Sequence, residues 1–531
     1  MSFLPQAKTK RLLAVHGWSG TVLGLLLYVV IFTGAIVVFA DEIGKWSQGV
    51  SVTEAGLPRQ VDHSFRMAAR TVDRAYYEEV VIFRSGSGHL EYRFHTHGTN
   101  EAGDAVERGV HLSVDPETGE INARHEGDVA DFPHPSGSAL RDFWVDLHVQ
   151  LYLPNPYGLV LVGVLGLAMM AAAISGVLIH GHIFRDAFVA TRDRARLVVA
   201  RDLHVLAGSW GLPFALILAF TGAFFGFATS LGVPVMALAV FGGDQQALIE
   251  TLIGLPAALD LTQAPLASLD YILADARRRT GGEAVSIVIS NYDSVGAQVR
   301  VFMGPAPGAL SGTVLEFAGV SRAFEGVQPI FGTAPSVGAS VFALIPALHF
   351  GDFAGLASKL VWMAMGLAMA FVAASGMLLW TRRRAEDPTW QSFQHWIVVT
   401  IWGLPLAMLI SAVTFFLTLP MGDPTWWTPA GFLAGVAVAL GLGAARHGAV
   451  LRLRLANAVL CLGLPVLRHL SGGTSWSEAL LAGAWSILLV DLLLLVLGLT
   501  LLRQHRLHRY RKNRLSTRAD RPALAAREPA E

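Results

Sequence analysis

The stretch LLAVHGWSGTVLGLLLYVVIFTGA, residues 12–35, places a histidine near the start of an apolar run that is long enough to cross a membrane. His16 lies 18 residues before Gly34 of the FTGA motif. The same motif recurs at 220–223, where His204 again lies 18 residues before the glycine. A spacing that repeats in this way indicates an internal duplication.

A second pair of segments shows the same relationship. The tetrapeptide GLAM occurs at 166–169 and at 366–369, and a Ser-Gly pair follows each copy. His148, in LHVQ, lies 28 residues before the first of these glycines, and His349, in LHFG, lies 27 residues before the second. Four histidines therefore hold matching places relative to four glycines. This pattern predicts that the first 380 residues contain two copies of a unit made of a helix, an inserted domain and a helix.

The composition identifies the class of protein. Hydrophobic residues make up 53% of the chain and charged residues only 15%, whereas a soluble domain is usually about 25% charged. Lys plus Arg and Asp plus Glu both number 40, which excludes a global polybasic surface for nucleic acid. The single cysteine, Cys461, excludes an intrachain disulfide, a Cys-ligated iron–sulfur cluster and C-x-x-C-H haem attachment. We therefore predict a mainly α-helical, polytopic membrane protein.

About eight apolar stretches are long enough to span a bilayer. They lie near 17–40, 157–180, 207–232, 356–380, 396–419, 429–446, 449–467 and 477–502. Basic segments, including Arg-Arg-Arg at 382–384 and the tail RQHRLHRYRKNR, fall on one side if every stretch crosses. Both termini are then cytoplasmic, and two long inserts face the periplasm of a bacterial inner membrane.

The pattern predicts eight segments in order. They are a first span (1–40), an inserted domain (41–145), a second span (146–182), a cytoplasmic loop with a third span (183–232), a second inserted domain (233–345), a fourth span (346–384), a four-helix membrane block (385–503) and a cytoplasmic tail (504–531). Each insert combines a polar, helix-like stretch with alternating strands that Gly, Asn and Asp punctuate. This arrangement is typical of a small α+β domain built from hairpins.

The four histidines form two pairs on this topology. His16 and His204 lie near the cytoplasmic ends of their spans, and His148 and His349 lie just before spans two and four, on the periplasmic side. A polar ring at membrane depth is a functional candidate, and two imidazoles that face each other can supply both axial ligands of a haem iron. The pairs predict two non-covalent, b-type haems, an inner one held by His16 and His204 and an outer one held by His148 and His349.

Other interpretations of these histidines stay open. A histidine at the membrane interface can simply end a helix, hydrogen-bonded to backbone or water. His180 and His182, in LIHGHIF, are alternative inner ligands, although a basic interfacial flank is the simpler interpretation, and His395 is similarly ambiguous. Zinc fits less well, because two histidines per site are fewer ligands than a typical zinc site has.

These residues carry a family resemblance. A basic leader followed by LLAVHGW and TGA, LH before the second span, RDLH before the third and LHFGDFAG before the fourth resemble the PepSY-associated transmembrane family. VDPETGEI at 114–121 is similar to the D-x-x-T-G turn of PepSY domains, so the resemblance implies two PepSY-like periplasmic inserts. It covers about residues 1–384 and is weaker in the second insert. Characterised relatives include inner-membrane ferric-siderophore reductases with two b haems, and the resemblance implies the same four histidines as ligands.

The expected function is that of a membrane-bound, haem-dependent reductase. Electrons would pass from the cytoplasmic side or a quinol to a periplasmic acceptor such as a ferric siderophore, since reduction to Fe(II) weakens binding to hard oxygen donors. No GxGxxG or P-loop motif supports nicotinamide or ATP binding. The alternative is a non-redox membrane scaffold or transport-associated protein whose PepSY-like domains bind peptides or partner proteins. The sequence identifies neither the electron donor nor the acceptor.

The extra membrane block contains one acid in an apolar run. Asp491 lies within LLVDLLLLV, and a carboxylate at mid-depth in a membrane is a functional candidate. Its nearest plausible partners are Asn457 or an arginine such as Arg452. A structural hydrogen bond between helices explains the carboxylate equally well.

The first insert contains a group of histidines. His95 and His97 share one face of the strand FHTH, and His111 lies on the next strand. These rings could bind a metal or an iron chelate, and solvent-facing strand histidines are the simpler interpretation.

Overall fold

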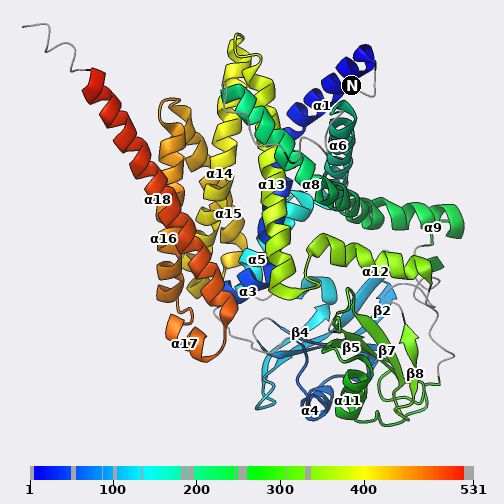
Figure 1. Ribbon diagram of the computed structural model, residues 1–531. Helices are drawn as coiled ribbons and strands as arrows, with labels where there is room; N and C mark the ends of the chain where they lie inside the picture. The colour runs from blue at the N-terminus through cyan, green and yellow to red at the C-terminus, as the bar shows by residue number, and fades with distance from the viewer. Residues whose placement is uncertain are drawn as a thin grey trace, which may run out of the picture.

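The protein is a bundle of membrane helices with a sheet domain beyond one end. The computed structural model describes residues 5–519 apart from 49–55, 86–87, 100–104, 133–135, 181–187, 189–195, 245–246, 249–259, 307 and 329–335. Among these residues, seven helices are long and apolar enough to cross a membrane, or eight if one bent pair of helices counts as a span. The sheet domain marks one end of the bundle, the domain end, and the first and last described residues lie toward the other, the terminal end (Figure 1). The prediction of a mainly helical, multi-pass membrane protein is confirmed.

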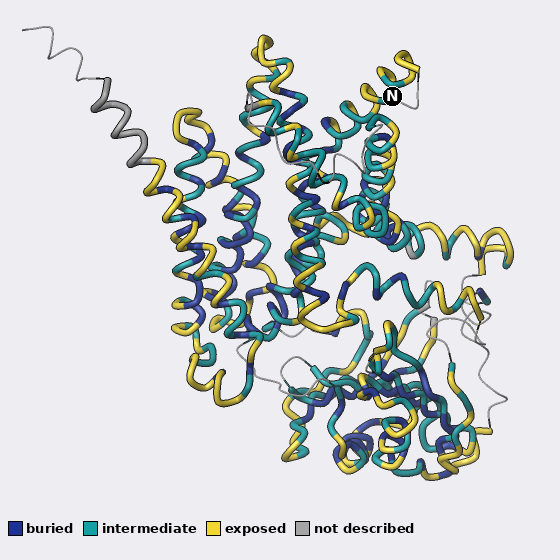
Figure 2. The backbone as a smooth tube through the Cα atoms, in the orientation of Figure 1, coloured by how far each residue is buried: buried dark blue, intermediate teal, exposed yellow. Residues whose placement is uncertain are grey.

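The membrane region has two parts. The first comprises α1 (Gln6–Val22), α2 (Gly24–Val37), α3 (Ala40–Gln48), α5 (Ala139–Gln150), α6 (Tyr157–Ile179), α8 (Arg196–Phe227), α9 (Val233–Phe241), α12 (Val337–Phe350) and α13 (Gly355–Arg382). The second comprises α14 (Pro388–Thr418), α15 (Pro424–Ala444), α16 (Ala449–Leu470), α17 (Trp476–Leu481) and α18 (Trp485–Ala519). Exposed apolar residues of these helices include Leu433, Val459 and Leu499, and Figure 2 shows exposed positions all along the outer helices of the bundle. Such a surface suits lipid, whose tails are as apolar as leucine.

The first span differs from the continuous helix that the sequence predicts at 17–40. It consists of α1 and α2, which bend by 66° at the break between them. The break is at Leu23, between Gly20 in the last turn of α1 and Gly24 at the start of α2, and glycine is a common cause of sharp helix kinks. Any Cβ on Gly24 would lie 2.6 Å from Met377 Sδ of α13, so the bend brings these helices into close contact. His16 therefore lies on α1, which runs in a different direction from the rest of the span.

The sheet domain combines both inserts. The first insert provides α4 (Asp62–Ala69), β1 (Glu79–Arg84), β2 (Leu90–Thr99), β3 (Ala105–Val114) and β4 (Ile121–Asp128). The second provides α11 (Leu269–Thr280), β5 (Ala284–Ser290), β6 (Gln298–Met303), β7 (Thr313–Ala318) and β8 (Phe324–Gln328). The sequence predicts two small α+β domains, and each insert does form a helix with four antiparallel strands. The expectation of separate domains is wrong, because β1 pairs with β5 and the strands form one sheet in the order β4-β3-β2-β1-β5-β6-β7-β8.

One hydrophobic core lies between this sheet and its two helices. Phe65 of α4 and Ile272 of α11 are buried in the same cluster as Phe94, Val299 and Phe317 of the strands. Because successive side chains of a strand point to opposite faces, the apolar alternate positions supply the core and the intervening polar residues face the other way. Figure 1 shows α4 and α11 on the side of the sheet away from the membrane helices. The polar face of the sheet is therefore turned toward the bundle.

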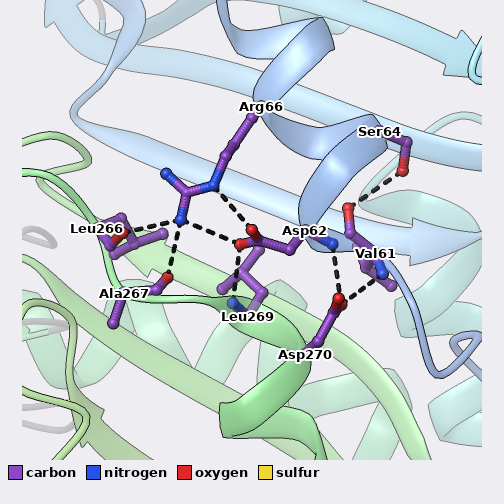
Figure 3. Close-up of polar contacts among 8 residues, drawn as sticks. All are labelled: Val61, Asp62, Ser64, Arg66, Leu266, Ala267, Leu269 and Asp270. Carbon is purple, nitrogen blue, oxygen red and sulfur yellow. Dashed lines mark hydrogen bonds and ion pairs between the residues drawn. The ribbon is translucent and has the colours of Figure 1, made fainter.

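The two inserts cap each other's helices, as Figure 3 shows. The Asp270 carboxylate of α11 accepts hydrogen bonds from the backbone N–H groups of Val61 (2.7 Å) and Asp62 (3.0 Å) at the start of α4. In return, the Asp62 carboxylate accepts one from the N–H of Leu269 (2.9 Å), the first residue of α11. The first N–H groups of a helix lack partners within the helix. Each insert therefore supplies the carboxylate that accepts hydrogen bonds from the first N–H groups of the other insert's helix. Arg66 adds a 2.8 Å ion pair to Asp62.

Replacing Asp270 with alanine should loosen the start of α4. Loss of a helix cap costs about 0.5–2 kcal/mol, and here two N–H groups lose their acceptor. Amide hydrogen–deuterium exchange in the first turn of α4 should quicken by about 5- to 30-fold, the factor that corresponds to one or two kcal/mol. Asp270→Asn keeps an acceptor oxygen and should exchange more slowly than Asp270→Ala. Equal exchange in the native protein and in Asp270→Ala would show that the reciprocal caps do not stabilise α4.

The boundary of the first insert also differs from the predicted 41–145. Both α3 and α5 pack against membrane helices rather than against the sheet. The Trp46 ring of α3 lies edge-on to Phe416 with centroids 5.1 Å apart, and Trp144 Nε1 of α5 donates a 3.0 Å hydrogen bond to Ser411 Oγ. These two short helices therefore join the inserted domain to the C-terminal block.

Asp491 has different partners from those that the sequence suggests. It accepts hydrogen bonds from Trp46 Nε1 (2.7 Å), Arg468 Nη2 (2.9 Å) and Trp476 Nε1 (2.8 Å). Neither Asn457 nor Arg452 contacts it: the first donates to the carbonyls of Trp402 and Leu453, and the second to carbonyls around 442–447. Because α18 begins at Trp485, Asp491 lies in its second turn, near the domain end, and not at mid-depth. Both carboxylate oxygens of Asp491 accept hydrogen bonds from neighbouring side chains, which indicates a structural role.

Candidate functional site

A cavity between the helices of the first part contains the inner pair of histidines. His16 of α1 and His204 of α8 both line it. Its volume of about 570 Å³ falls within the range of about 300–1,000 Å³ that small-molecule sites occupy. Most of the lining is apolar or glycine, and Arg201 and Arg383 provide positive charge. Arg383 follows the last residue of α13, so the charged part lies toward the terminal end. The cavity suits a large apolar ligand that carries an anionic group.

Hydrogen bonds hold one nitrogen of each inner histidine. His16 Nδ1 lies 3.0 Å from the carbonyl oxygen of Ala172, to which it can only donate. His204 Nδ1 lies 2.9 Å from Ser375 Oγ. Since Ser375 Oγ itself donates to the carbonyl of Val372, it accepts a hydrogen bond from His204. Both rings therefore carry their proton on Nδ1, and Nε2 keeps the lone pair that binds metals.

The outer pair is brought together at the domain end. The rings of His148 on α5 and His349 on α12 have centroids 6.2 Å apart and planes inclined by 26°. Two imidazoles that bind one metal ion end-on, each at about 2 Å, have ring centroids about 6 Å apart. His148 Nδ1 donates to the carbonyl of Val30 (2.9 Å), and His349 Nδ1 lies 2.8 Å from Thr221 Oγ1. Because Thr221 Oγ1 donates to a carbonyl of its own helix, the proton again sits on Nδ1.

Each of the four rings also lies against one of the four glycines that the sequence pattern singles out. A Cβ on Gly34 would lie 2.6 Å from Cε1 of His148, and one on Gly376 would lie 3.1 Å from Cε1 of His204. A Cβ on Gly176 would lie 3.4 Å from Cε1 of His16, and one on Gly222 would lie 3.4 Å from Cε1 of His349. The glycines of FTGA and Ser-Gly therefore make room for a histidine ring from a neighbouring helix.

The structure places the remaining histidines as follows. His180, at the end of α6, lines the inner cavity and keeps its place as an alternative ligand, and His182 lies outside the described residues. His395 Nε2 lies 2.9 Å from the carbonyl of Gly443 and ties α14 to α15. Ser375 and Thr221, which hold His204 and His349 by Nδ1, are not among the site residues predicted from the sequence, although both stand beside the repeated glycines.

Two of the three strand histidines lie together, and the third does not. Ligand atoms of His95, His97 and Glu107 all lie within 4.8 Å of one another. His111 Nε2 instead lies 3.0 Å from the Glu91 carboxylate. Burial by itself raises the pKa of Glu91, but hydrogen bonds from His111, Ser85 and Ser113 outweigh it and lower the pKa. His111 therefore has a partner of its own.

Comparison with known proteins identifies the family. A sequence profile described as the PepSY-associated TM region matches residues 13–383. The chain belongs to this family. The match includes the four histidines, both inserts and the membrane helices up to α13, whereas α14–α18 lie beyond it.

One relative has been found in Pseudomonas aeruginosa. The uncharacterized protein PA4219 of that organism is 32% identical over 270 residues, which are 46% of this chain and 64% of the relative. The chain thus covers less than two thirds of that protein.

Proposed function

We propose that this PepSY-associated protein is a di-haem b oxidoreductase of the bacterial inner membrane. His16 and His204 would hold the inner haem, and His148 and His349 the outer one. The observation that carries the proposal is shared by all four rings: each Nδ1 donates to a fixed acceptor, so that each Nε2 is available for iron. Histidines that bind metals almost always donate their other nitrogen in this way, whereas a histidine that merely ends a helix has no need of the same tautomer at four sites.

The inner cavity fits a haem in chemistry as well as in size. The apolar lining suits a tetrapyrrole, and Arg201 and Arg383 would pair with its propionate carboxylates. Bound haem supplies one-electron exchange between Fe(III) and Fe(II). The chain's own residues orient the ligands, since the bonds from Nδ1 fix each ring and make it a more basic ligand. The apolar helices around the cavity keep water away from the ligands.

The topology supports transfer of electrons across the membrane. The first and last described residues and the arginine-lined cavity lie toward the terminal end, where basic segments indicate the cytoplasm. The pair His148 and His349 lies at the domain end, where the sheet domain would face the periplasm. The matching contacts between histidine and glycine support the internal duplication that the sequence predicts. Electrons from a cytoplasmic donor or a quinol would thus reach a periplasmic acceptor.

A ferric siderophore is the proposed acceptor. Reduction to Fe(II) weakens the bonds to hard oxygen donors, so the iron leaves without destruction of the chelator. The outer pair lies where the membrane helices meet the sheet domain, and the polar face of the sheet is turned toward it. A hydrophilic iron chelate could approach the outer haem along this face.

Absorption spectroscopy tests the cofactor. The protein purified in detergent should show reduced-minus-oxidised bands of b-type haem and contain two haems per chain by pyridine haemochrome analysis. A folded, monodisperse protein without haem would contradict the proposal and favour a non-redox scaffold whose sheet domain binds peptides or partner proteins.

Activity is tested in proteoliposomes. With a quinol or another reductant inside, a ferric siderophore outside should be reduced, and a ferrous chelator added outside should take up the iron. The control is the same liposome with a variant that lacks the outer pair. If this variant reduces the siderophore equally fast, the outer histidines are not on the electron path.

A further inference from the structure

The polar face of the sheet carries a group of side chains that the proposed electron path does not use. His95 and His97 are alternate residues of β2, so they share a face, and Glu107 stands opposite His97 on β3. Glu79 of β1 stands opposite His95. Phe94, which precedes His95 on β2, points into the hydrophobic core. Because successive side chains of a strand alternate between faces, the group lies on the other face, toward the membrane helices.

The contacts around His97 are those of a metal ligand held by a carboxylate. His97 Nδ1 lies 3.0 Å from Glu78 Oε1, and Glu78 Oε2 accepts the backbone N–H of His97 at 3.1 Å. Since Nδ1 donates to Glu78, Nε2 of the neutral ring carries a lone pair. That nitrogen lies 3.7 Å from Glu107 Oε1. Two lone pairs at this distance repel each other unless a proton or a metal ion lies between them.

His95 adds a buried ring that lacks hydrogen bonds. Its side chain is only 5% exposed, and its Nδ1 has no hydrogen-bond partner among the described residues. Its Nε2 lies 3.6 Å from Glu79 Oε1, beyond hydrogen-bond distance. A buried nitrogen without a partner costs free energy, and coordination to a metal ion would remove that cost. A Cβ on Gly109, opposite His95, would lie 2.8 Å from His95 Cβ, so the close pairing of these two residues requires glycine.

We propose that His95, His97 and Glu107 bind a divalent transition-metal ion. Two imidazoles and one carboxylate are the protein ligands that Zn²⁺ and Fe²⁺ use in open sites, with water or another group completing the shell. The ligand atoms are within 4.8 Å of one another, so shifts of about 1 Å would bring all three to about 2 Å from a common ion. Glu78 positions His97, and Glu79 neutralises part of the ion's charge. The site lies on the sheet domain and does not depend on haem.

Zinc content of the full-length protein tests this site. The protein, purified in detergent without a polyhistidine tag, is equilibrated with Zn²⁺ and analysed for bound zinc by mass spectrometry. Zn²⁺ is a suitable probe, because imidazole nitrogen and carboxylate oxygen are among its usual protein ligands and it has no redox chemistry of its own. The native protein should bind one Zn²⁺ per chain. His97→Ala and Glu107→Gln should each weaken binding by at least about tenfold, because loss of even an outer partner costs about 10- to 100-fold.

The variants are chosen so that folding does not decide the result. The side chains of His97 and Glu107 are about half exposed, 51% and 50%, so their replacement leaves the core intact. His63→Ala is the matched control: this exposed histidine lies on α4, on the other side of the sheet, and its loss should leave zinc binding unchanged. If the native protein binds no zinc, or if His97→Ala and Glu107→Gln bind it as tightly as His63→Ala, the facing groups are a protonated ion pair and the proposal is wrong. Zinc content and haem content are measured separately, so the proposed metal site and the proposed haem sites can each be refuted without the other.

Discussion

Replacing both His148 and His349 with alanine should reduce the haem content from two per chain to one. These rings lie 6.2 Å apart at the domain end, so the double variant removes every ligand of one site and none of the other. Replacing His16 and His204 together should also leave one haem. The measurement is haem content by pyridine haemochrome, with size-exclusion chromatography to show that each variant is folded.

A crossed variant decides whether the pairing is right. His148→Ala combined with His204→Ala removes one ligand from each proposed site and should lower the haem content below that of either double variant. If the crossed variant keeps one intact haem, the pairs are His148 with His204 and His16 with His349, and the assignment is wrong. His395→Ala is the control, because that ring bonds to the backbone of Gly443 and should leave both haems in place. His180→Ala tests the alternative inner ligand and should also leave both.

The residues that hold Nδ1 should tune the haem rather than bind it. Thr221→Val keeps the size of the side chain but removes the acceptor of His349 Nδ1, and Thr221→Ser keeps the acceptor. A less basic ligand stabilises Fe(III) less, so Thr221→Val should retain the outer haem and raise its midpoint potential, while Thr221→Ser should resemble the native protein. An unchanged potential in Thr221→Val would show that this hydrogen bond does not act on the iron.

Much of this architecture could be predicted because it depends on short, regular patterns. The spans follow from apolar length, and the register of the histidines follows from spacing to repeated glycines. The spacing identifies all four histidines and all four glycines that are in contact. It does not show which histidine packs against which glycine, such as His148 against Gly34 or His204 against Gly376. Those contacts join helices that lie far apart in the sequence, and no local pattern encodes which helices are neighbours.

The features that were missed depend on tertiary contacts. The bend between α1 and α2 lies in a stretch whose hydropathy is continuous, and it becomes visible only through the close approach of Met377 to Gly24. The joining of the inserts depends on one strand pairing, β1 with β5, and on the exchange of caps between Asp62 and Asp270. Alternating strand patterns predict that a strand exists, but not which edge it pairs with.

Asp491 shows the same limit for charge. Its position within an apolar run predicts a place in the middle of the membrane, because the run does not reveal that α18 begins only six residues earlier, at Trp485. Its partner Arg468 belongs to the last turns of α16, and the other donors come from α3 and α17. The carboxylate thus joins the C-terminal block to a helix of the region that the family profile matches.

Removing Arg468 should destabilise the protein more than any other single substitution considered. The side chains of Arg468 and Asp491 are each only 1% exposed, and breaking a buried ion pair costs about 3–5 kcal/mol because one charge is left uncompensated. Arg468→Met should lower the midpoint of thermal unfolding in detergent by about 3–5 °C, because 1 kcal/mol shifts the midpoint of a chain of this length by roughly 1 °C. The matched control is Arg454→Met on the same helix, where the guanidinium stacks on Trp402 at 4.3 Å and its loss costs about 1 kcal/mol.

A double variant separates the cost of the lone charge from the loss of packing. Arg468→Met combined with Asp491→Leu removes both charges, and such replacements are often neutral or better. The double variant should therefore unfold at a higher temperature than Arg468→Met alone, although Trp46 Nε1 and Trp476 Nε1 both lose their acceptor. If the double variant unfolds at the same temperature as Arg468→Met, or at a lower one, the ion pair itself stabilises the contact between α16 and α18. The predicted recovery instead means that Asp491 is costly on its own, and that its partners Trp46 and Arg468 make it a specific link between the C-terminal block and α3.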